Sequence, residues 1–236
     1  ASHPKALHTM RFLMIASGYP PARSAGLERG CQRLSAALVR RGHAVIVLTL
    51  ASTDLAPDAV EPDGVRVLRA LKPLALGPLW GLDLMRQVRS WAMRLAGEWD
   101  FALCHKLYLH SAALAAAGRR IGKPTGSLLV NAGPFSDIKL LREHRFGEWL
   151  LRESLRDQHI FALSADSVAE LASEGVSDAT VRRYRYFVDL ARFTPAPAAS
   201  PPEFLYIGRF HPQKNIPGLI DAFEILHRIH PQARLR

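Results

Sequence analysis

Residues 11–50 read RFLMIASGYPPARSAGLERGCQRLSAALVRRGHAVIVLTL, in which two apolar runs enclose a loop and an amphipathic segment. The runs Arg11–Ala16 and Ala44–Leu50 predict strands that are buried on both faces, because polar residues do not alternate regularly with apolar ones. From Gly26 to Arg41 the apolar residues recur at helical spacing, and Gly42 predicts the end of that helix. Two strands joined by a crossover helix pair in parallel, so this stretch predicts an α/β protein.

The alternation of strands and helices continues along the chain. We expect further strands at Val65–Leu68, Phe101–Cys104, Ser127–Val130, Ile160–Leu163 and Thr180–Tyr184, and helices at Leu82–Gly97, Ser111–Arg120, Asp137–Asp157 and from Ser164 to Gly175. The predicted fold class is α/β, with a doubly wound parallel sheet. Ligands of such sheets bind where the strands end, which directs attention to the loops after the first, fourth, fifth and sixth strands.

Changes of composition divide the chain into four parts. Residues 1–9 show no periodicity and form a tail, and residues 10–194 form an N-terminal domain. Residues 195–202, PAPAASPP, predict an extended and semi-rigid linker. Residues 203–236 predict one strand, a loop, one helix and the first residue of another strand. So short a segment cannot bury a core of its own, so we expect a second domain that is cut short.

The composition excludes several classes of protein. The 236 residues are 48% hydrophobic and 22% charged, which is ordinary for a globular chain. The longest apolar run begins at Ala44 and is too short to cross a bilayer, and the first apolar stretch is too short for a signal peptide. Cys31 and Cys104 lack the spacing of metal ligands, so we expect reduced core thiols, no metal site and a cytoplasmic protein.

The charge balance is basic, with 31 Lys and Arg against 21 Asp and Glu, a formal net charge of +10 at pH 7. A basic surface suits nucleic acid, an anionic membrane or a phosphorylated substrate. The basic residues are spread along the chain without a concentrated block or a nucleic-acid-binding module, so we expect no nucleic-acid partner. The alternative is a protein without any polyanionic partner.

The segment Leu205–Asn215, LYIGRFHPQKN, carries the clearest chemical signal. It places Gly208, Arg209 and Lys214 in a loop between a predicted strand and a predicted helix. The two cations are five residues apart and can converge on one anion, towards which the following helix directs its free N–H groups. This arrangement suits a diphosphate without a metal ion. The alternative is two exposed basic residues in an ordinary loop.

The segment Tyr19–Arg29, YPPARSAGLER, opens a helix at the end of a predicted strand. Gly26 at the junction allows the backbone to approach a ligand closely. The glycines do not have the G-x-G-x-x-G spacing of a dinucleotide-binding loop, and no Gly-Lys-Ser/Thr follows to make a P-loop. An ordinary turn is the alternative here.

In their order and spacing these segments resemble the retaining family 4 glycosyltransferases of the GT-B type. The resemblance spans nearly the whole chain. The family's Pro-Pro and Gly-Gly-x-Glu-Arg motifs appear as residues 20–21 and 25–29, and its Arg-Gly-His as residues 41–43. Its later Gly-Arg-Leu-x-x-x-Lys-Gly motif appears as residues 208–215, GRFHPQKN.

Further positions match the same family. Ser164 corresponds to the serine after the sixth strand, and Val188-Asp189 through Phe193 and Pro195 to the end of an Asn-Gly-Val-Asp…Phe-x-Pro segment. His105 falls near the second histidine of an Asp-x-x-His-x-His pattern, with Asp100 in place. A partly buried, hydrogen-bonded histidine is the alternative for both His105 and His110.

The chain also departs from the family pattern. Ala25 replaces the first glycine of the Gly-Gly pair, and Tyr186-Phe187 replace the Asn-Gly before Val188. The histidine that many members carry after the fifth strand is missing near Asn131. The pair of glutamates that holds the donor sugar and ribose in the family would lie beyond Arg236.

The resemblance implies a GT-B architecture of two Rossmann-like domains, with residues 10–194 on the acceptor side and residues 203–236 beginning the nucleotide-sugar-binding domain. It implies a hexosyltransferase-type enzyme that moves a sugar from a nucleotide diphosphate sugar to an acceptor hydroxyl with retention, in cell-surface glycan or lipopolysaccharide synthesis. The nucleotide sugar is a substrate, and no cofactor is expected. A GT-B epimerase or phosphorylase, or a non-catalytic nucleotide-binding fragment, remains as an alternative.

The sequence thus yields a set of candidate site residues. We assign catalysis to Arg209, Lys214 and His105, donor phosphate binding to Gly26, Gly208, Arg209 and Lys214, and the acceptor side to Asn131, His110 and Ser164.

Two predicted helices mix tryptophan with arginine, as interfacial helices do. The residues concerned are Trp80, Trp91, Trp99 and Trp149, with Arg86, Arg89, Arg94, Arg142, Arg145, Arg152 and Arg156. With the positive net charge, this pattern predicts a saccharide or lipid-linked acceptor and peripheral attachment to the anionic inner face of the cell membrane. The alternative is tryptophans that face the core beside a solvated arginine face.

Overall fold

The computed structural model describes residues 8–77, 79–186, 188, 190, 193–194 and 201–236. Contacts divide the chain into two compact units, Ala1–Tyr186 and Phe187–Arg236. The expected tail therefore falls largely outside the described residues, as does the expected linker. The first unit contains β1 (Arg11–Ile15), α1 (Gly26–Arg40), β2 (Ala44–Leu50), β3 (Asp58–Val60), β4 (Arg66–Leu71), α2 (Leu79–Arg94), β5 (Phe101–Cys104), α3 (Leu109–Ile121), β6 (Thr125–Leu129), the 3-10 turn η1 (Gly133–Phe135), α4 (Asp137–Arg142), α5 (Gly147–Leu155), β7 (His159–Ala162), α6 (Ala165–Ser173) and β8 (Val181–Arg183).

The strands of this unit form one eight-stranded sheet in the order β3-β4-β2-β1-β5-β6-β7-β8. Every neighbouring pair is parallel except β3 and β4, which are antiparallel. The prediction of an α/β sheet with parallel pairing is thus confirmed. The edge strand β3 is a correction: its three residues, between Pro57 and Pro62, are too few to show the periodicity of a strand.

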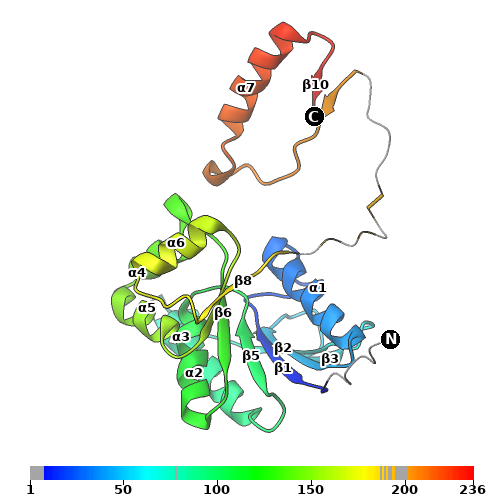
Figure 1. The fold of residues 1–236 in the computed structure, drawn as a ribbon. Coiled ribbons are helices and arrows are strands. Elements are labelled where there is room, and N and C mark those ends of the chain that lie inside the picture. The colour runs from blue at the N-terminus through cyan, green and yellow to red at the C-terminus, as the bar shows by residue number, and fades with distance from the viewer. Residues whose placement is uncertain (1–7, 78, 187, 189, 191–192, 195–200) are drawn as a thin grey trace, which may run out of the picture. The chain divides into compact units, whose positions relative to one another are not determined.

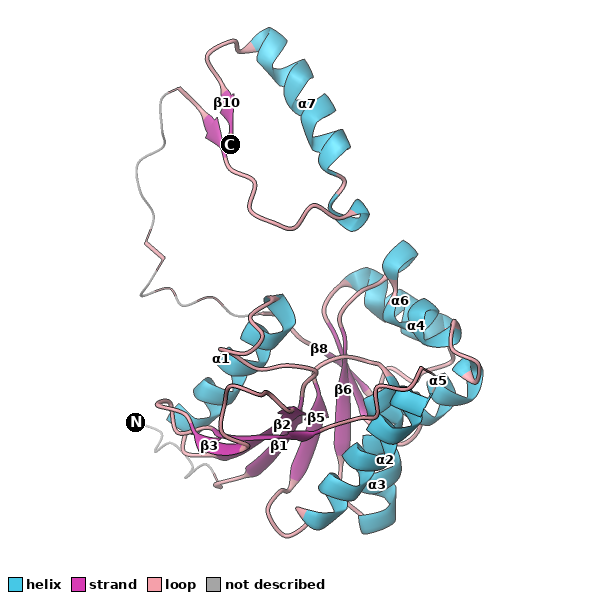
Figure 2. Ribbon diagram, turned by 180° about the vertical axis from the view of Figure 1, so that it is seen from behind, coloured by secondary structure: helices cyan, strands magenta, loops and turns pink. Residues whose placement is uncertain are grey.

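The two faces of the sheet bury alternate residues of the same strands. In β1, Leu13 and Ile15 join a cluster with α2 and α3, whereas Met14 joins a second cluster with α1. Successive side chains of a strand point to opposite faces, so one continuous apolar run serves both layers. Figures 1 and 2 show α1 on one side of the sheet and α2 and α3 on the other. The apolar run of β2 is divided between the two clusters in the same way.

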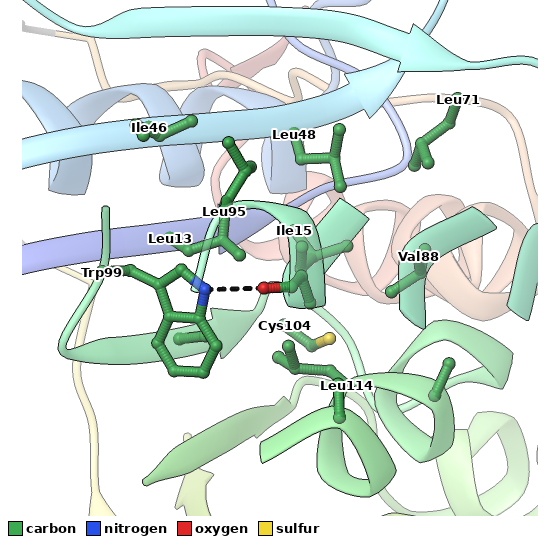
Figure 3. Packing of buried hydrophobic residues seen from close by; sticks show 14 of the residues in the cluster. Leu13, Ile15, Ile46, Leu48, Leu71, Val88, Leu95, Trp99, Cys104 and Leu114 are labelled. Atoms are coloured by element: carbon green, nitrogen blue, oxygen red, sulfur yellow. Dashed lines mark hydrogen bonds between the residues drawn. The ribbon is translucent and has the colours of Figure 1, made fainter. Parts of the chain in front are cut away.

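Trp99 belongs to the cluster between the sheet and α2 and α3 (Figure 3). Its side chain is fully buried, and its indole N–H donates to the carbonyl of Ala92 at 3.0 Å. The expectation that Trp99 belongs to a membrane-facing surface is therefore wrong. Trp80 and Trp91 are partly buried and pack against the buried clusters, whereas Trp149 is 55% exposed.

The predicted helix Asp137–Asp157 is two helices, α4 and α5, separated by a turn at residues 143–146. Ser136 begins α4, where its side-chain oxygen accepts N–H groups from Ile138 and Lys139. The break turns α5 so that Leu150 and Leu151 join the same buried cluster as Leu141 of α4. An apolar pattern that serves both helices does not reveal this turn.

The second unit consists of β9 (Glu203–Phe204), the 3-10 turn η2 (Pro212–Lys214), α7 (Ile216–Ile229) and β10 (Arg234–Leu235). Strands β9 and β10 pair in parallel, as expected for strands joined by a helix. No described residue of α7 is buried, and Ile220, Ile225 and Ile229 are exposed. This strand–helix–strand unit is the local pattern that the sequence predicts.

Cys31 and Cys104 are free and buried, which confirms the prediction of core thiols. Cys31 belongs to the cluster beside α1 and Cys104 to the cluster beside α2 and α3. Burial raises the pKa of the Cys31 thiol to about 12 and also raises that of Cys104. In the described part of the chain, no helix is long and apolar enough to cross a membrane.

We predict that Leu114→Ala lowers the free energy of unfolding by about 2–5 kcal/mol, because it opens a cavity in the buried cluster of Figure 3. Leu82→Ala on the exposed face of α2, at a side chain that is 66% exposed, should change it by no more than about 0.5 kcal/mol. Urea denaturation followed by circular dichroism measures both. Equal effects of the two substitutions would contradict the placement of this core.

Candidate functional site

Three cavities adjoin one another around Ser17, at the edge of the sheet where the parallel strands end. The smallest lies between the β1–α1 loop and the end of β5, and its lining includes Leu27, Glu28, His105, Lys106 and His110. The second, of about 300 Å³, extends towards α2, and the third, of about 380 Å³, extends along the segment after β2. The carboxyl edge of the sheet is thus hollowed where the prediction placed a ligand.

His105 follows β5, and its backbone N–H donates to the carbonyl of Ile15 at 2.9 Å, which continues the ladder with β1. Both of its ring nitrogens are buried without a hydrogen-bond partner among the described residues, and so is Nε2 of His110 on α3. Burial, together with a smaller effect of the nearby His110, lowers the pKa of His105 to about 3. Burial and the Lys106 charge lower the pKa of His110 to about 4. Both imidazoles are therefore neutral at pH 7 and can form hydrogen bonds with a hydroxyl group.

The first turn of α1 forms another wall of the smallest cavity. Gly26 is the first residue of this helix, and Ala25 before it offers no side-chain cap to the free N–H groups. A Cβ atom built at Gly26 would meet nothing within 4 Å, so the space beside it is open. Glu28 is buried and leaves one carboxylate oxygen without a partner among the described residues. The close approach of a ligand to Gly26 stays a prediction.

Asn131 belongs to a network centred on the buried carboxylate of Asp137. Asp137 accepts the backbone N–H of Val130 at 2.9 Å and the side-chain amide of Asn131 at 2.9 Å. Its Oδ1 also lies 3.6 Å from Nζ of Lys106. The network joins the loops that follow β5 and β6, so in this structure Asn131 supports the backbone of the site's wall. Neither Asp137 nor Lys106 was predicted from the sequence as a site residue.

Ser164 begins α6, where its Oγ accepts the backbone N–H of Ser167 at 3.1 Å. The same oxygen lies 3.0 Å from Oγ of Ser167. Serine satisfies free N–H groups at helix starts in this way. The structure therefore gives Ser164 a capping contact in the loop after β7, and its role towards an acceptor stays a prediction.

In the second unit, Gly208 and Arg209 form a tight loop with Tyr206. The Tyr206 hydroxyl donates to the carbonyl of Arg209 at 2.9 Å, and a Cβ at Gly208 would collide with that hydroxyl. Lys214 ends η2, and Asn215 follows in the left-handed conformation, with φ of 47°, before α7 begins. The side chains of Arg209 and Lys214 are exposed and form no ion pair with any described residue. Both charges are thus available in the loop that leads to α7.

The predicted residues fall into separate groups. His105 and His110 line one cavity with Ser17, Glu28 and Lys106, close to the first turn of α1. Asn131 and Ser164 follow the next two strands at the same edge of the sheet, while Gly208, Arg209 and Lys214 gather in the second unit. The residues after β1, Ser17 and Arg23 among them, were missed, although a loop after the first strand is where a ligand was expected. Asp100 lies elsewhere and pairs with Arg11 at 2.5 Å.

Residues 24–192 match the model of the family described as Glycosyltransferase Family 4. The chain belongs to glycosyltransferase family 4. A glycogen synthase of Mycobacterium tuberculosis is 30% identical to this family 4 chain over 264 aligned positions. That alignment covers 96% of the chain and 60% of the synthase, so the chain spans about 60% of the length of this relative.

Solved structures share the fold of this family 4 chain. The catalytic domain of starch synthase IV from Arabidopsis thaliana, bound to ADP and acarbose, superimposes with a TM-score of 0.64 at 12% identity, over 96% of this chain and 68% of that one. The Anabaena protein HepE in complex with UDP gives a TM-score of 0.62 at 17% identity, over 91% and 57%. The expected GT-B, Rossmann-like fold is thereby confirmed.

The buried histidines predict a pH dependence of stability. Their pKa values are lower in the folded chain than the ordinary 6.5, so the unfolded chain takes up protons first as the pH falls. The two histidines therefore stabilise the fold fully when the pH is well above 6.5. As the pH falls below 6.5, the free energy of unfolding decreases, by about 1.4 kcal/mol for each histidine at pH 5.5.

This dependence is measured by urea denaturation at pH 7.5 and at pH 5.5. His105→Gln and His110→Gln should each remove about 1.4 kcal/mol of the difference between the two pH values. His8→Gln, at an exposed position near the start of the chain, is the matched control and should leave the difference unchanged. An unchanged difference in all three variants would show that the two imidazoles are not buried as neutral groups.

Proposed function

We propose that this family 4 chain acts as a hexosyltransferase that moves a sugar from a nucleotide diphosphate sugar to an acceptor hydroxyl with retention of configuration. Family membership and the two unpaired cations in the loop that leads to α7 support this proposal. Two structures with the same fold are described as bound to UDP and to ADP, the nucleotide parts of such donors. We place the reaction in cell-surface glycan or lipopolysaccharide synthesis.

The loop of the second unit carries the chemical argument. When the glycosidic bond of the donor breaks, negative charge develops on the departing diphosphate. Arg209 and Lys214 supply fixed positive charge at that point, and the free N–H groups at the start of α7 add to it. No three His, Cys, Asp or Glu side chains come together as a metal site within the described residues. The proposal gives neutralisation of the diphosphate to Arg209 and Lys214.

The first unit would bind the acceptor at the carboxyl edge of its sheet. The neutral imidazole of His105 offers a hydrogen bond to an acceptor or donor hydroxyl without adding charge. The open space beside Gly26 leaves room for the diphosphate to approach the first turn of α1. In this proposal the first unit positions the hydroxyl group and the second unit stabilises the leaving group.

We predict that Arg209→Ala and Lys214→Ala each lower turnover by about 10²–10³, because each removes a charge from the leaving diphosphate. The rates are measured with a radiolabelled donor in a protein extended to the length of its relatives. Arg228→Ala is the matched control, since Arg228 lies on the exposed surface of α7 and pairs with Glu224 at 2.5 Å. Unchanged rates in both loop variants would contradict the diphosphate assignment.

The products of the same reaction distinguish the proposed transfer from its alternatives. A labelled disaccharide or glycolipid with the donor's anomeric configuration indicates retaining transfer. A labelled epimer of the donor, or a sugar phosphate, would indicate epimerase or phosphorylase chemistry. Binding of UDP or GDP without any turnover would favour a nucleotide-binding fragment.

We also propose that the chain attaches peripherally to the anionic, cytoplasmic face of a membrane. The net charge of +10 and the exposed cations of α2 support this. Arg86 pairs with Asp83, and Arg94 stacks on Trp91 at 3.8 Å. Arg89 makes neither kind of contact among the described residues, and its charge is therefore available to a lipid headgroup. On α4, Arg142 is already engaged by Glu148 and Glu174.

We predict that the joint change of Arg86, Arg89 and Arg94 to Gln weakens binding to vesicles that contain anionic lipid. Each cation near such a surface contributes about 1 kcal/mol, and the attraction decays within a Debye length. Sedimentation at low and high salt measures the effect, with neutral vesicles as reference. The matched control changes Arg33, Arg40 and Arg41 together to Gln, which removes the same charge from α1 and its C-cap. Equal losses in both triple variants, or no binding at low salt, would overturn this proposal.

A further inference from the structure

The two larger cavities around Ser17 have different linings. The cavity of about 300 Å³ is lined mainly by apolar side chains, including Ile15, Leu71, Trp80 and Leu84. The cavity of about 380 Å³ is lined largely by polar side chains, including Tyr19, Thr49, Thr53 and Arg69. Ser17, Arg23 and Leu50 line both. A molecule that occupies both cavities must therefore be polar at one end and apolar at the other.

The polar cavity has buried groups without partners. Tyr19 OH, Thr49 Oγ1 and Arg69 Nε are all buried and form no hydrogen bond with a described residue. These three residues are at most 3% exposed. Buried polar atoms are normally hydrogen-bonded, since leaving one unpaired costs about 1–3 kcal/mol. A ligand head that carries several hydroxyl groups fits this lining.

Arg23 supplies the uncompensated charge between the cavities. Arg69 is neutralised by Glu61, whose Oε1 lies 2.6 Å from its guanidinium. Arg23 forms no ion pair with a described residue, and its side chain lies over Gly18. A Cβ at Gly18 would lie 2.7 Å from both Cβ and Cδ of Arg23, so the glycine makes this placement of the arginine possible. The junction of the two cavities therefore favours an anionic group.

An exposed apolar surface adjoins the apolar cavity. We call it the leucine lip, formed by Leu74, Leu76, Leu79 and Leu82, whose side chains are 49–66% exposed. It spans the loop after β4 and the first turns of α2, and in the sequence it lies between Leu71 and Leu84, two residues that line the cavity. Clustered exposed leucines of this kind mark a binding surface.

Hydrogen bonds hold the leucine lip in place. The Gln87 side chain accepts the N–H of Lys72 at 2.8 Å and donates to its carbonyl at 2.9 Å. Asp83 accepts the N–H of Leu74 at 3.2 Å. Polar groups of the loop thus form hydrogen bonds with α2 while the leucines remain exposed. The hydrogen bonds therefore fix the loop in a conformation that exposes the leucine side chains.

We propose that the acceptor is an anionic lipid in which a phosphate joins a hydroxyl-bearing head to a hydrocarbon tail. The head occupies the polar cavity, the phosphate pairs with Arg23, and the tail occupies the apolar cavity and passes over the leucine lip into the membrane. This inference rests on the proposed function, because it takes the cavities as the acceptor site. Two exposed cations, Lys72 after β4 and Arg89 of α2, match the charge of an anionic bilayer.

The test uses decyl phosphate, a single-chain alkyl phosphate, below its micelle concentration and without any donor. Binding is followed by tryptophan fluorescence, because Trp80 lines the apolar cavity. We expect saturable binding at least tenfold tighter than that of 1-decanol or inorganic phosphate, since neither of these reaches both subsites. The signal should disappear in Trp80→Phe and persist in Trp149→Phe, which alters an exposed tryptophan away from the cavities.

Arg23→Gln should weaken decyl phosphate binding about tenfold or more, because it removes a charge-assisted hydrogen bond. Arg40→Gln is the matched control: it removes the same charge at the far end of α1 and should have no effect. Leu76→Ser with Leu79→Ser should reduce sedimentation with vesicles that contain phosphatidylglycerol, whereas Val60→Ser on the edge strand β3 should not.

Three results would overturn the inference: equal binding of decyl phosphate and 1-decanol, no effect of Arg23→Gln, or a signal that survives Trp80→Phe. Tight binding of inorganic phosphate alone would point to a soluble phosphorylated acceptor instead. These binding measurements need no catalysis. An absence of glycosyl transfer would therefore refute the proposed function without changing the binding results. Transfer to a neutral saccharide that is indifferent to Arg23→Gln would refute the inference alone.

Discussion

The parallel pairing of β1 with both β2 and β5 is the constraint on which the first unit depends. Ile15 lies opposite Leu48 on one side and Cys104 on the other, so three strands end at nearly the same level. Ser17 and His105 follow β1 and β5, and Leu50 ends β2, so these residues meet at one edge and line adjoining cavities. At the opposite edge, Arg11 bonds to the Asp100 carboxylate and ties β1 to β5. One edge of the sheet is closed by ion pairs, and the other leaves polar groups without partners.

Charge is used differently in the two units. His105 and His110 are buried and neutral, and the Asp137 carboxylate is satisfied by backbone and amide N–H groups. Arg209 and Lys214, in contrast, are exposed. A cation 4 Å from a phosphate contributes about 1 kcal/mol in water and about 4 kcal/mol where the surroundings are partly shielded. The same two side chains therefore act much more strongly once a bound ligand displaces the water around them.

The sequence predicted those helices and strands whose own residues show a clear apolar pattern. The bounds of β2 and β5 were predicted correctly because each is a mainly apolar run that follows a helix. Strand β3 was missed because it is held by its antiparallel partner rather than by a pattern of its own. Trp99 was assigned to a surface from the arginines near it in sequence, whereas its side chain is fully buried in an apolar cluster. Arg209 and Lys214 were found because they share one loop. The cavities were not predicted, because their linings combine residues that lie far apart in the sequence, such as Arg23, Arg69 and Trp80.

The two cysteines give the fold a pair of independent internal reporters. Cys31 lies in the layer beside α1, and Cys104 lies in the layer beside α2 and α3, so the sheet itself separates the two thiols. Neither thiol can ionise or meet a reagent until its own layer opens, because burial suppresses the reactive thiolate. The rate at which each thiol reacts with a labelling reagent therefore measures the opening of one face of the sheet. If the two rates differ, the layers open separately, and the chain loosens one face at a time.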